Sequence, residues 1–303
     1  MRVFYFNLIC AIIGIGKIRG ATDKMLGAII GDVVGSRFEF KDFKSRDFVF
    51  FTEANKPTDD SLMTLAVAKG LLNSRGDWTQ LSELTQKYMH EIARKHPNVG
   101  WGYRFYRWVF ELDSSSPNSL GNGAGMRVSP VGWVARDEEE VRLLSRLVTE
   151  FTHGHPEGLL GAEAVAMAVF LAREGYTKEY IHKRMVEDYY PSIDSFTLDS
   201  IRPIYSIDDR GEWVTCRGSI PQALRAFLES EDFEGAIRNA ISIGGDADTI
   251  AAMAGSVAEA YYGVPAQMED EVLKYLSPDL ESIYYAFNTI KLPRKQRIDT
   301  GMD

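Results

Sequence analysis

Cysteine is scarce in this sequence: Cys10 and Cys216 are the only two in 303 residues. Two cysteines are too few for a disulfide framework or for a zinc site built from thiolates. Their scarcity favours a reducing, cytoplasmic setting. Dense runs of lysine and arginine are also absent, and 34 basic against 43 acidic residues give a net charge of −9. Nucleic-acid binding by phosphate neutralisation is therefore not expected.

Apolar runs long enough to cross a membrane are lacking as well. The N-terminal run, residues 3–16, is shorter than the roughly 20 residues that a membrane span needs. Lys17 and Arg19 follow it, and no small-residue cleavage site is obvious. We expect no stable membrane association. We interpret residues 1–24 as an N-terminal appendage, either sequence upstream of a start at Met25 or a partner-binding segment, and residues 25–303 as one domain.

Strand signals are few, because almost every apolar segment repeats at helical spacing. The predicted helices are Ser61–Asn73, Thr79–Arg94, Glu138–Phe151, Gly158–Glu174, Lys178–Asp188, Ile220–Ser230, Phe233–Ile243 and Asp248–Gly263. No internal repeat of fixed length appears, which disfavours a solenoid. The sequence therefore predicts a single all-α domain.

What the sequence does contain is two clusters of aspartate and threonine, each at the start of a helix that runs into apolar sequence. The clusters are Thr58-Asp59-Asp60 and Asp246-x-Asp248-Thr249. Carboxylates and hydroxyl groups are ligands that Mg²⁺ and Mn²⁺ prefer. Four carboxylates suit two ions better than one, and a metal pair can orient a substrate and activate water. The alternative is that each cluster only caps its helix.

A further carboxylate segment, GAIIGDVVGSRFEF, carries Asp32 and Glu39. Its glycines recur every four residues, so one face of the predicted helix is bare backbone that can pack closely against another helix. The helix from residue 251 is crowded with alanine, glycine and serine, and we expect it to be central. Glu39, just past the glycine-bearing helix, is a candidate acid, base or movable metal ligand.

Two loops and an aromatic cluster complete the candidates. The glycine-rich loop at residues 121–130 offers backbone N–H groups of the kind that hold phosphate oxygens, with Arg127 either facing phosphate or lying on the surface. THGHPEG, residues 152–158, has no third zinc ligand at suitable spacing, so hydrogen bonding to a ligand or helix capping is favoured. The aromatic cluster is expected to pack in the core, the alternative being that one or two of its rings stack on a base; its members are Trp101, Tyr103, Phe105, Tyr106 and Trp108.

Taken in order, GDVVGSRFE, PTDDS, GNGAGMRVSP, THGHPEG and SIGGDADT resemble the motifs of the ADP-ribosylglycohydrolases. The resemblance covers about residues 25–290. It implies an all-α orthogonal helical bundle with a binuclear centre of two Mg²⁺ or Mn²⁺ ions in a central cleft. The adenine-stacking aromatic residue is poorly defined by the motifs and is not assigned.

The resemblance also implies roles for individual residues. The implied metal ligands are Thr58, Asp59, Asp60, Asp246, Asp248 and Thr249. The implied catalytic residues are Asp59, Asp60, Glu39 and Asp246. The implied substrate-binding residues are Glu39, Asn122, Gly123, Gly125, Met126 and His153. Glu39 matches a glutamate that, in some members, moves between closing over the metals and admitting substrate.

The activity that the resemblance implies is hydrolysis of the glycosidic bond between ADP-ribose and a protein side chain, with arginine as the expected residue. The partners would be an ADP-ribosylated protein as substrate and ADP-ribose as product. The motifs do not separate an arginine linkage from a serine linkage. The alternative is a non-catalytic ADP-ribose-binding protein or an immunity-type protein on the same fold.

Overall fold

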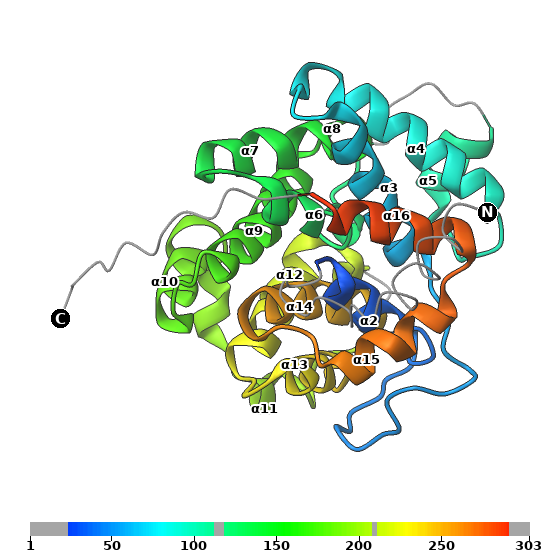
Figure 1. Cartoon of the computed structure of the whole chain (residues 1–303). Helices are drawn as coiled ribbons and strands as arrows, with labels where there is room; N and C mark the ends of the chain where they lie inside the picture. Colours follow the sequence, from blue (N-terminus) through cyan, green and yellow to red (C-terminus); the bar gives the residue numbers. More distant parts are fainter. Residues whose placement is uncertain (1–23, 112–117, 208–210, 291–303) are drawn as a thin grey trace, which may run out of the picture.

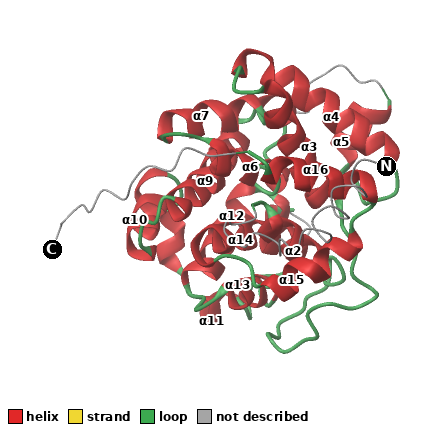
Figure 2. Cartoon of the chain, in the orientation of Figure 1, coloured by secondary structure: helices red, strands yellow, loops and turns green. Residues whose placement is uncertain are grey.

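The computed structural model describes residues 24–111, 118–207 and 211–290. Within these ranges the chain forms fifteen α-helices and no β-strand, only one isolated bridge between Gly121 and Thr215 (Figures 1 and 2). The predicted all-α class is confirmed. The appendage predicted at residues 1–24 lies outside the described residues except for Lys24, whose backbone N–H donates to Asn288 Oδ1.

The helices follow one another along the chain, with a long helix-free connection at residues 36–58. They are α2 (Leu26–Gly35), α3 (Asp59–Ser74), α4 (Leu81–Lys95), α5 (Tyr103–Phe110), α6 (Ser129–Val134), α7 (Glu138–Leu147), α8 (Glu150–His153), α9 (Pro156–Arg173), α10 (Lys178–Asp188), α11 (Leu198–Ile201), α12 (Cys216–Leu228), α13 (Phe233–Ile241), α14 (Ala247–Tyr262), α15 (Ala266–Val272) and α16 (Pro278–Asn288).

One predicted helix is divided in the structure. The segment expected to form a helix from Glu138 to Phe151 forms α7 and α8, with Val148 and Thr149 between them. Two adjacent β-branched residues lower helix propensity at this point. The carbonyl oxygen of Thr149 then accepts the N–H groups of Thr152 and His153, which starts the new turn.

The centre of the molecule is the contact between α2 and α14, which lie side by side (Figure 1). All ten residues of α2 are buried. A Cβ atom on Gly27 would lie 2.1 Å from the carbonyl oxygen of Gly255, and one on Gly31 would lie 2.1 Å from that of Ala251. Only glycine permits this approach. The predicted close packing of the glycine face is thus confirmed, and its partner is the small-residue helix.

The carboxylate of Glu259, on α14, joins the same two helices at their other end. It is buried, and its two oxygens accept the backbone N–H groups of Leu26 and Gly27 at 3.0 and 2.9 Å. These are first-turn N–H groups that α2 itself cannot satisfy. These two hydrogen bonds therefore fix the position of α2 along the axis of α14 as well as its packing against α14. They thereby determine where the carboxylate of Asp32 lies.

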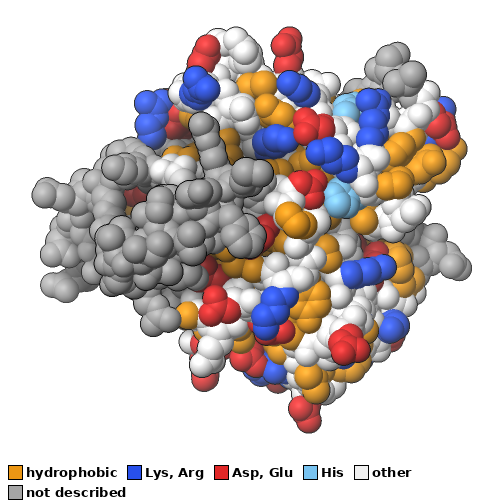
Figure 3. All heavy atoms as spheres, turned by 45° about the vertical axis from the view of Figure 1, so that its right-hand side comes forward, with side chains coloured by type: hydrophobic (Ala, Val, Ile, Leu, Met, Phe, Trp, Pro, Cys, Tyr) orange, Lys and Arg blue, Asp and Glu red, His pale blue; other side chains and the backbone are white. Residues whose placement is uncertain are grey.

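The remaining helices enclose this pair. α14 also packs on α9, α12 and α13, while α3 packs on α4 and α16. On the face shown in Figure 3, basic side chains are interspersed with acidic ones rather than gathered in a patch. In the described part of the chain, no helix combines the length and the apolar character that crossing a bilayer requires.

Candidate metal centre and active site

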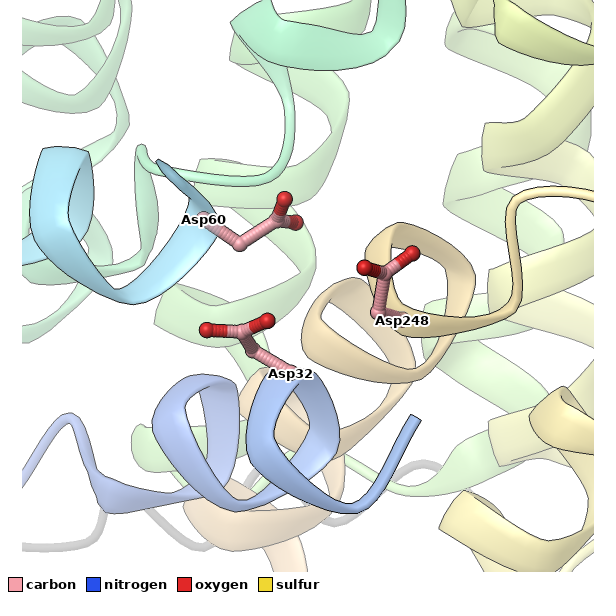
Figure 4. Close-up of side chains that lie close together, drawn as sticks. All are labelled: Asp32, Asp60 and Asp248. Atoms are coloured by element: carbon pink, nitrogen blue, oxygen red, sulfur yellow. The ribbon is translucent and has the colours of Figure 1, made fainter. Parts of the chain in front are cut away.

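Three buried aspartates from separate helices meet beside the contact of α2 with α14. Asp32 comes from the second half of α2, Asp60 from the first turn of α3, and Asp248 from the first turn of α14 (Figure 4). One carboxylate oxygen from each lies within 4.8 Å of the other two. The two acidic turns that are far apart in the sequence therefore meet in space.

A second group of three carboxylates adjoins the first. Glu39, Asp246 and Asp248 also place one oxygen each within 4.8 Å of one another. Asp248 belongs to both groups, so the two potential ion positions are neighbours. Glu39 is half-buried, whereas both aspartates of this group are buried.

Asp32 is a member of the cluster that the sequence did not assign as a ligand. Its Oδ2 accepts the backbone N–H groups of Thr58 and Ser61 at 2.9 and 3.0 Å, and also the Ser61 hydroxyl; its Oδ1 accepts the Thr58 hydroxyl at 2.7 Å. Asp32 thus holds the start of α3 in place. The sequence feature that could have identified Asp32 as a site residue is that it is the single carboxylate within the otherwise apolar segment LGAIIGDVVG.

Asp60 retains an unused acceptor although it is buried. Its Oδ2 accepts the Thr249 hydroxyl at 3.2 Å and lies 3.5 Å from that of Thr58, but its Oδ1 has no hydrogen-bond partner among the described residues. A buried carboxylate oxygen without a partner is costly. The hydroxyl groups of the two predicted threonine ligands therefore both lie beside the carboxylate of Asp60.

Helix capping explains only part of the two clusters. The Thr58 hydroxyl accepts the N–H of Asp60 at 3.3 Å and caps α3. At α14, however, Asp246 makes no capping bond with its side chain. The capping alternative is thus correct for Thr58 and does not account for Asp246.

The electrostatics of the cluster are unfavourable without added positive charge. Burial is the main cause that raises the pKa of each aspartate, and neighbouring carboxylates raise several of them further; the residues are Asp32, Asp59, Asp60, Asp246 and Asp248. Burial, and then the charges of Asp246 and Asp32, raise the pKa of Glu39 to about 7. Within the described ranges no lysine or arginine forms an ion pair with any of the six.

These features together fit hard divalent cations. The donors are all oxygen atoms, the negative charge is uncompensated by ion pairs, and Asp60 Oδ1 is buried without a partner. Mg²⁺ and Mn²⁺ take such ligands. Asp59 is half-buried and lies in neither group of three, so its carboxylate is next to the cluster rather than among its closest oxygens.

The glycine-rich loop reaches the same place through Asn122. Its side-chain amide donates to Asp246 Oδ2 at 2.6 Å. The backbone N–H groups of Gly125 and Met126 donate to the carbonyl oxygen of Asn122 at 2.8 and 3.1 Å. The expectation of free N–H groups is therefore corrected at these two residues. Gly125 is close-packed, since a Cβ there would lie 2.9 Å from Met253 Sδ.

Comparison with known proteins is consistent with this site. The sequence profile of the ADP-ribosylglycohydrolase family matches residues 16–291. The chain belongs to the ADP-ribosylglycohydrolase family. The matched region begins inside the segment that the sequence analysis interpreted as an appendage.

Named relatives of this family member span most of its length. Human ADP-ribosylhydrolase ARH3 is 26% identical over 337 residues, covering 87% of this chain and 92% of its own. ADP-ribosylarginine hydrolase Tri1 of Pseudomonas putida is 27% identical over 289 residues, covering 84% and 73%. A solved structure described as an ADP-ribosylglycohydrolase-related protein complex superposes with a TM-score of 0.62 at 24% identity, covering 88% of this chain and 96% of that one, and confirms the fold.

In this family member the two histidines of THGHPEG have separate places. His155 is the N-cap of α9, where its Nδ1 accepts the N–H of Glu157 at 3.1 Å. His153 is buried against the glycine-rich loop, with Nε2 3.1 Å from where a Cβ of Gly123 would lie. Arg127 is 1% exposed, which excludes the surface position that the sequence left open.

The aromatic residues near α5 mainly build structure. Trp101, Phe105 and Trp108 form a chain of ring contacts with centroids 5.2 and 5.4 Å apart. Trp108 is buried and its ring lies 5.8 Å from that of Phe151. The predicted core packing is confirmed for Trp108, whereas Tyr103 is 75% exposed.

Proposed function

We propose that this protein is a metal-dependent hydrolase that cleaves the glycosidic bond between ADP-ribose and a protein side chain, and that arginine is the modified residue. The observation that carries the proposal is the pair of adjoining carboxylate groups that share Asp248. Two neighbouring positions for hard cations suit a substrate with a vicinal diol and a water nucleophile.

The proposed ion ligands are those of the sequence analysis together with Asp32. A bound pair of divalent ions would supply positive charge that orients the ribose hydroxyl groups and makes a nearby water more acidic. Asp32, Asp60 and Asp248 surround one position, and Glu39, Asp246 and Asp248 the other. Thr58 and Thr249 contribute hydroxyl groups beside Asp60.

The carboxylates at the edge of the cluster act as the proton acceptor in the reaction. Asp59 and Glu39 are half-buried, and either one accepts the proton of the attacking water. As the bond to the side chain breaks, the ribose develops oxocarbenium character. The surrounding carboxylates stabilise this positive charge. The products are free ADP-ribose and the unmodified protein.

The linkage is proposed from similarity alone. One relative, Tri1, is named for its linkage as an ADP-ribosylarginine hydrolase. ARH3, at comparable identity, carries only the name ADP-ribosylhydrolase. Arginine-linked and serine-linked ADP-ribosyl peptides incubated in parallel, with and without Mg²⁺ or Mn²⁺, separate the two linkages directly.

Two charge-removing variants test the activity. Asp59→Asn and Asp246→Asn are expected to lower the rate of ADP-ribose release by more than about a hundredfold, because they remove a proton acceptor and an ion ligand. The helical circular-dichroism signal should stay unchanged. Asp232→Asn is a matched control, since Asp232 is an exposed cap at the start of α13 and belongs to neither group of three carboxylates.

Wild-type rates for either site variant in the presence of a chelator would refute the proposed mechanism. ADP-ribose binding without turnover of any modified peptide would instead favour the non-catalytic alternative. Product analysis completes the test: ADP-ribose is expected, whereas AMP would indicate a phosphohydrolase.

A further inference from the structure

Arg127 is a buried cation on which the charge of the acidic cluster acts. Among the described residues, however, no carboxylate forms an ion pair with it. Its side chain is 1% exposed, and its Nε has no hydrogen-bond partner among the described residues. The charge of Asp59 acts on it, but its side chain contacts the Thr152 hydroxyl and, at 3.4 Å, His153 Nδ1. Arg127 thus links the acidic cluster to the histidine beside the glycine-rich loop.

The hydroxyl group of Thr152 has one proton and three neighbours. Arg127 Nη2 can only donate to it, because a guanidinium has no acceptor. The two acceptors within reach are Thr149 O at 3.3 Å and His153 Nδ1 at 2.9 Å. The Thr149 oxygen already accepts the backbone N–H groups of Thr152 and His153 at 3.1 and 2.8 Å. The hydroxyl proton therefore belongs on the bond to His153 Nδ1.

This assignment decides the tautomer of the imidazole. A ring nitrogen that accepts a hydrogen bond carries no proton, so the proton of neutral His153 is on Nε2. The contact of Nδ1 with Arg127 also favours an unprotonated Nδ1, since a guanidinium can only donate and would repel an Nδ1–H directed at it. Both neighbours of Nδ1 thus favour one arrangement.

Nε2 itself faces the glycine-rich loop. A Cβ on Gly123 would lie 3.1 Å from Nε2, and one on Gly121 would lie 3.8 Å away. Since both positions are glycine, neither residue places a side chain over this edge of the ring. The N–H of Nε2 has no hydrogen-bond partner among the described residues and is free to bind one.

We propose that Thr152, oriented by Arg127, is a positioning residue that holds His153 as the neutral Nε2–H tautomer, so that His153 donates a hydrogen bond over Gly123 to an oxygen of the ADP-ribose portion of the substrate. This inference rests on the proposed function for the identity of the ligand. It makes His153 a donor to a ribose hydroxyl or phosphate oxygen and excludes it as the general base.

The tautomer can be measured without any assay of activity. In ¹⁵N-histidine-labelled protein, long-range ¹H–¹⁵N correlation spectra distinguish a protonated ring nitrogen from an unprotonated one. His153→Gln identifies the His153 signals by their loss. We expect the wild type to show an unprotonated Nδ1 and a protonated Nε2. Thr152→Val should move the signals toward the Nδ1–H form, and Thr152→Ser, which keeps the hydroxyl, should restore the wild-type pattern.

Binding of ADP-ribose by calorimetry in Mg²⁺ gives the second readout. Thr152→Val should bind about tenfold more weakly, as expected for one lost hydrogen bond to a buried polar group, and Thr152→Ser should bind like the wild type. A wild-type His153 with its proton on Nδ1 overturns the inference, whatever the protein hydrolyses. So does a Thr152→Val variant whose tautomer changes while its affinity does not.

Failure of the proposed function would give results different from failure of the inference about Thr152. An Nε2–H tautomer in a wild-type protein that releases no ADP-ribose from any peptide would refute the hydrolase activity and still support the role of Thr152. The tautomer depends only on contacts within the chain, whereas turnover depends on the acidic cluster.

Discussion

Replacing Gly31 by alanine is expected to disturb the acidic cluster, although Gly31 is not itself a candidate ligand. A Cβ at this position would lie 2.1 Å from Ala251 O, 2.3 Å from Ala251 C and 2.6 Å from Ala252 N. All three are backbone atoms of α14, so no flexible side chain can move aside. Ordinary contact begins at 3.4 Å, so the helices must separate by about 1.3 Å, the difference from 2.1 Å.

The expected loss of stability follows from two opposing effects. Overpacking costs about 1–3 kcal/mol, and a rigid backbone obstacle places this change near 3. Alanine recovers about 1 kcal/mol of helix propensity relative to glycine. The net loss of about 2 kcal/mol corresponds to a Tm lower by about 3 °C in a chain of this size, because the entropy of unfolding grows with chain length.

The effect on the site should be larger than the effect on stability. Asp32 follows Gly31 on α2, and Asp248 lies on α14, so separation of the helices moves these carboxylates apart. Mg²⁺ tolerates about 0.2 Å of error in ligand distance. We therefore expect the affinity for Mg²⁺ or Mn²⁺, measured by calorimetry on the folded variant, to fall by about tenfold to a hundredfold.

Gly102→Ala provides the matched control. Gly102 has φ −57° and no atom within 4 Å of the position of an added Cβ, so its replacement should change neither Tm nor metal affinity. A Gly31→Ala variant with wild-type Tm and wild-type affinity would refute the argument that the glycine face of α2 sets the spacing of the carboxylates.

Two other predictions concern ions and pH. Added Mg²⁺ or Mn²⁺ at about 100 times its Kd should stabilise the protein by about 2.7 kcal/mol per site, visible as a rise in Tm that a chelator reverses. Equal Tm values for the protein with the ion and for the same sample with excess chelator would contradict this prediction. Bonds from Arg184 lower the pKa of Glu138 below 4.5, so this pair contributes stability above pH 4.5 that is lost as the pH falls through the lowered pKa. Glu138→Gln should therefore lower the free energy of unfolding at pH 7 by about 1 kcal/mol, as for a partly exposed pair, and so lower Tm there, and have no effect at a pH below that pKa.

Much of the fold was predictable because helical periodicity is a local signal. The predicted helix at Lys178–Asp188 has the bounds of α10, and the glycine face of α2 correctly indicated a close helix contact. The break between α7 and α8 was missed because two β-branched residues only weaken a helix, and the hydrogen bonds that Thr149 accepts from Thr152 and His153 start the new turn. The short helices α15 and α16 were also not identified.

The candidate site was predictable where residues of one kind are clustered in sequence. The acidic pairs at 59–60 and 246–248 stand out in this way. Asp32 was not assigned, because its role depends on hydrogen bonds to Thr58 and Ser61 across the packed helices. The bond from Asn122 to Asp246 and the burial of Arg127 are likewise results of tertiary structure that no local pattern indicates.

The balance of charge gives a physical reason to expect two ions rather than one. Asp32, Glu39, Asp59, Asp60, Asp246 and Asp248 carry six negative charges when ionised, and Arg127 is the buried cation whose charge acts on the cluster. One divalent ion with Arg127 would leave three negative charges uncompensated, whereas two would leave one. Burial of uncompensated charge opposes folding. We therefore expect the stable form of this chain to include cations, and metal binding and folding should be measurably coupled.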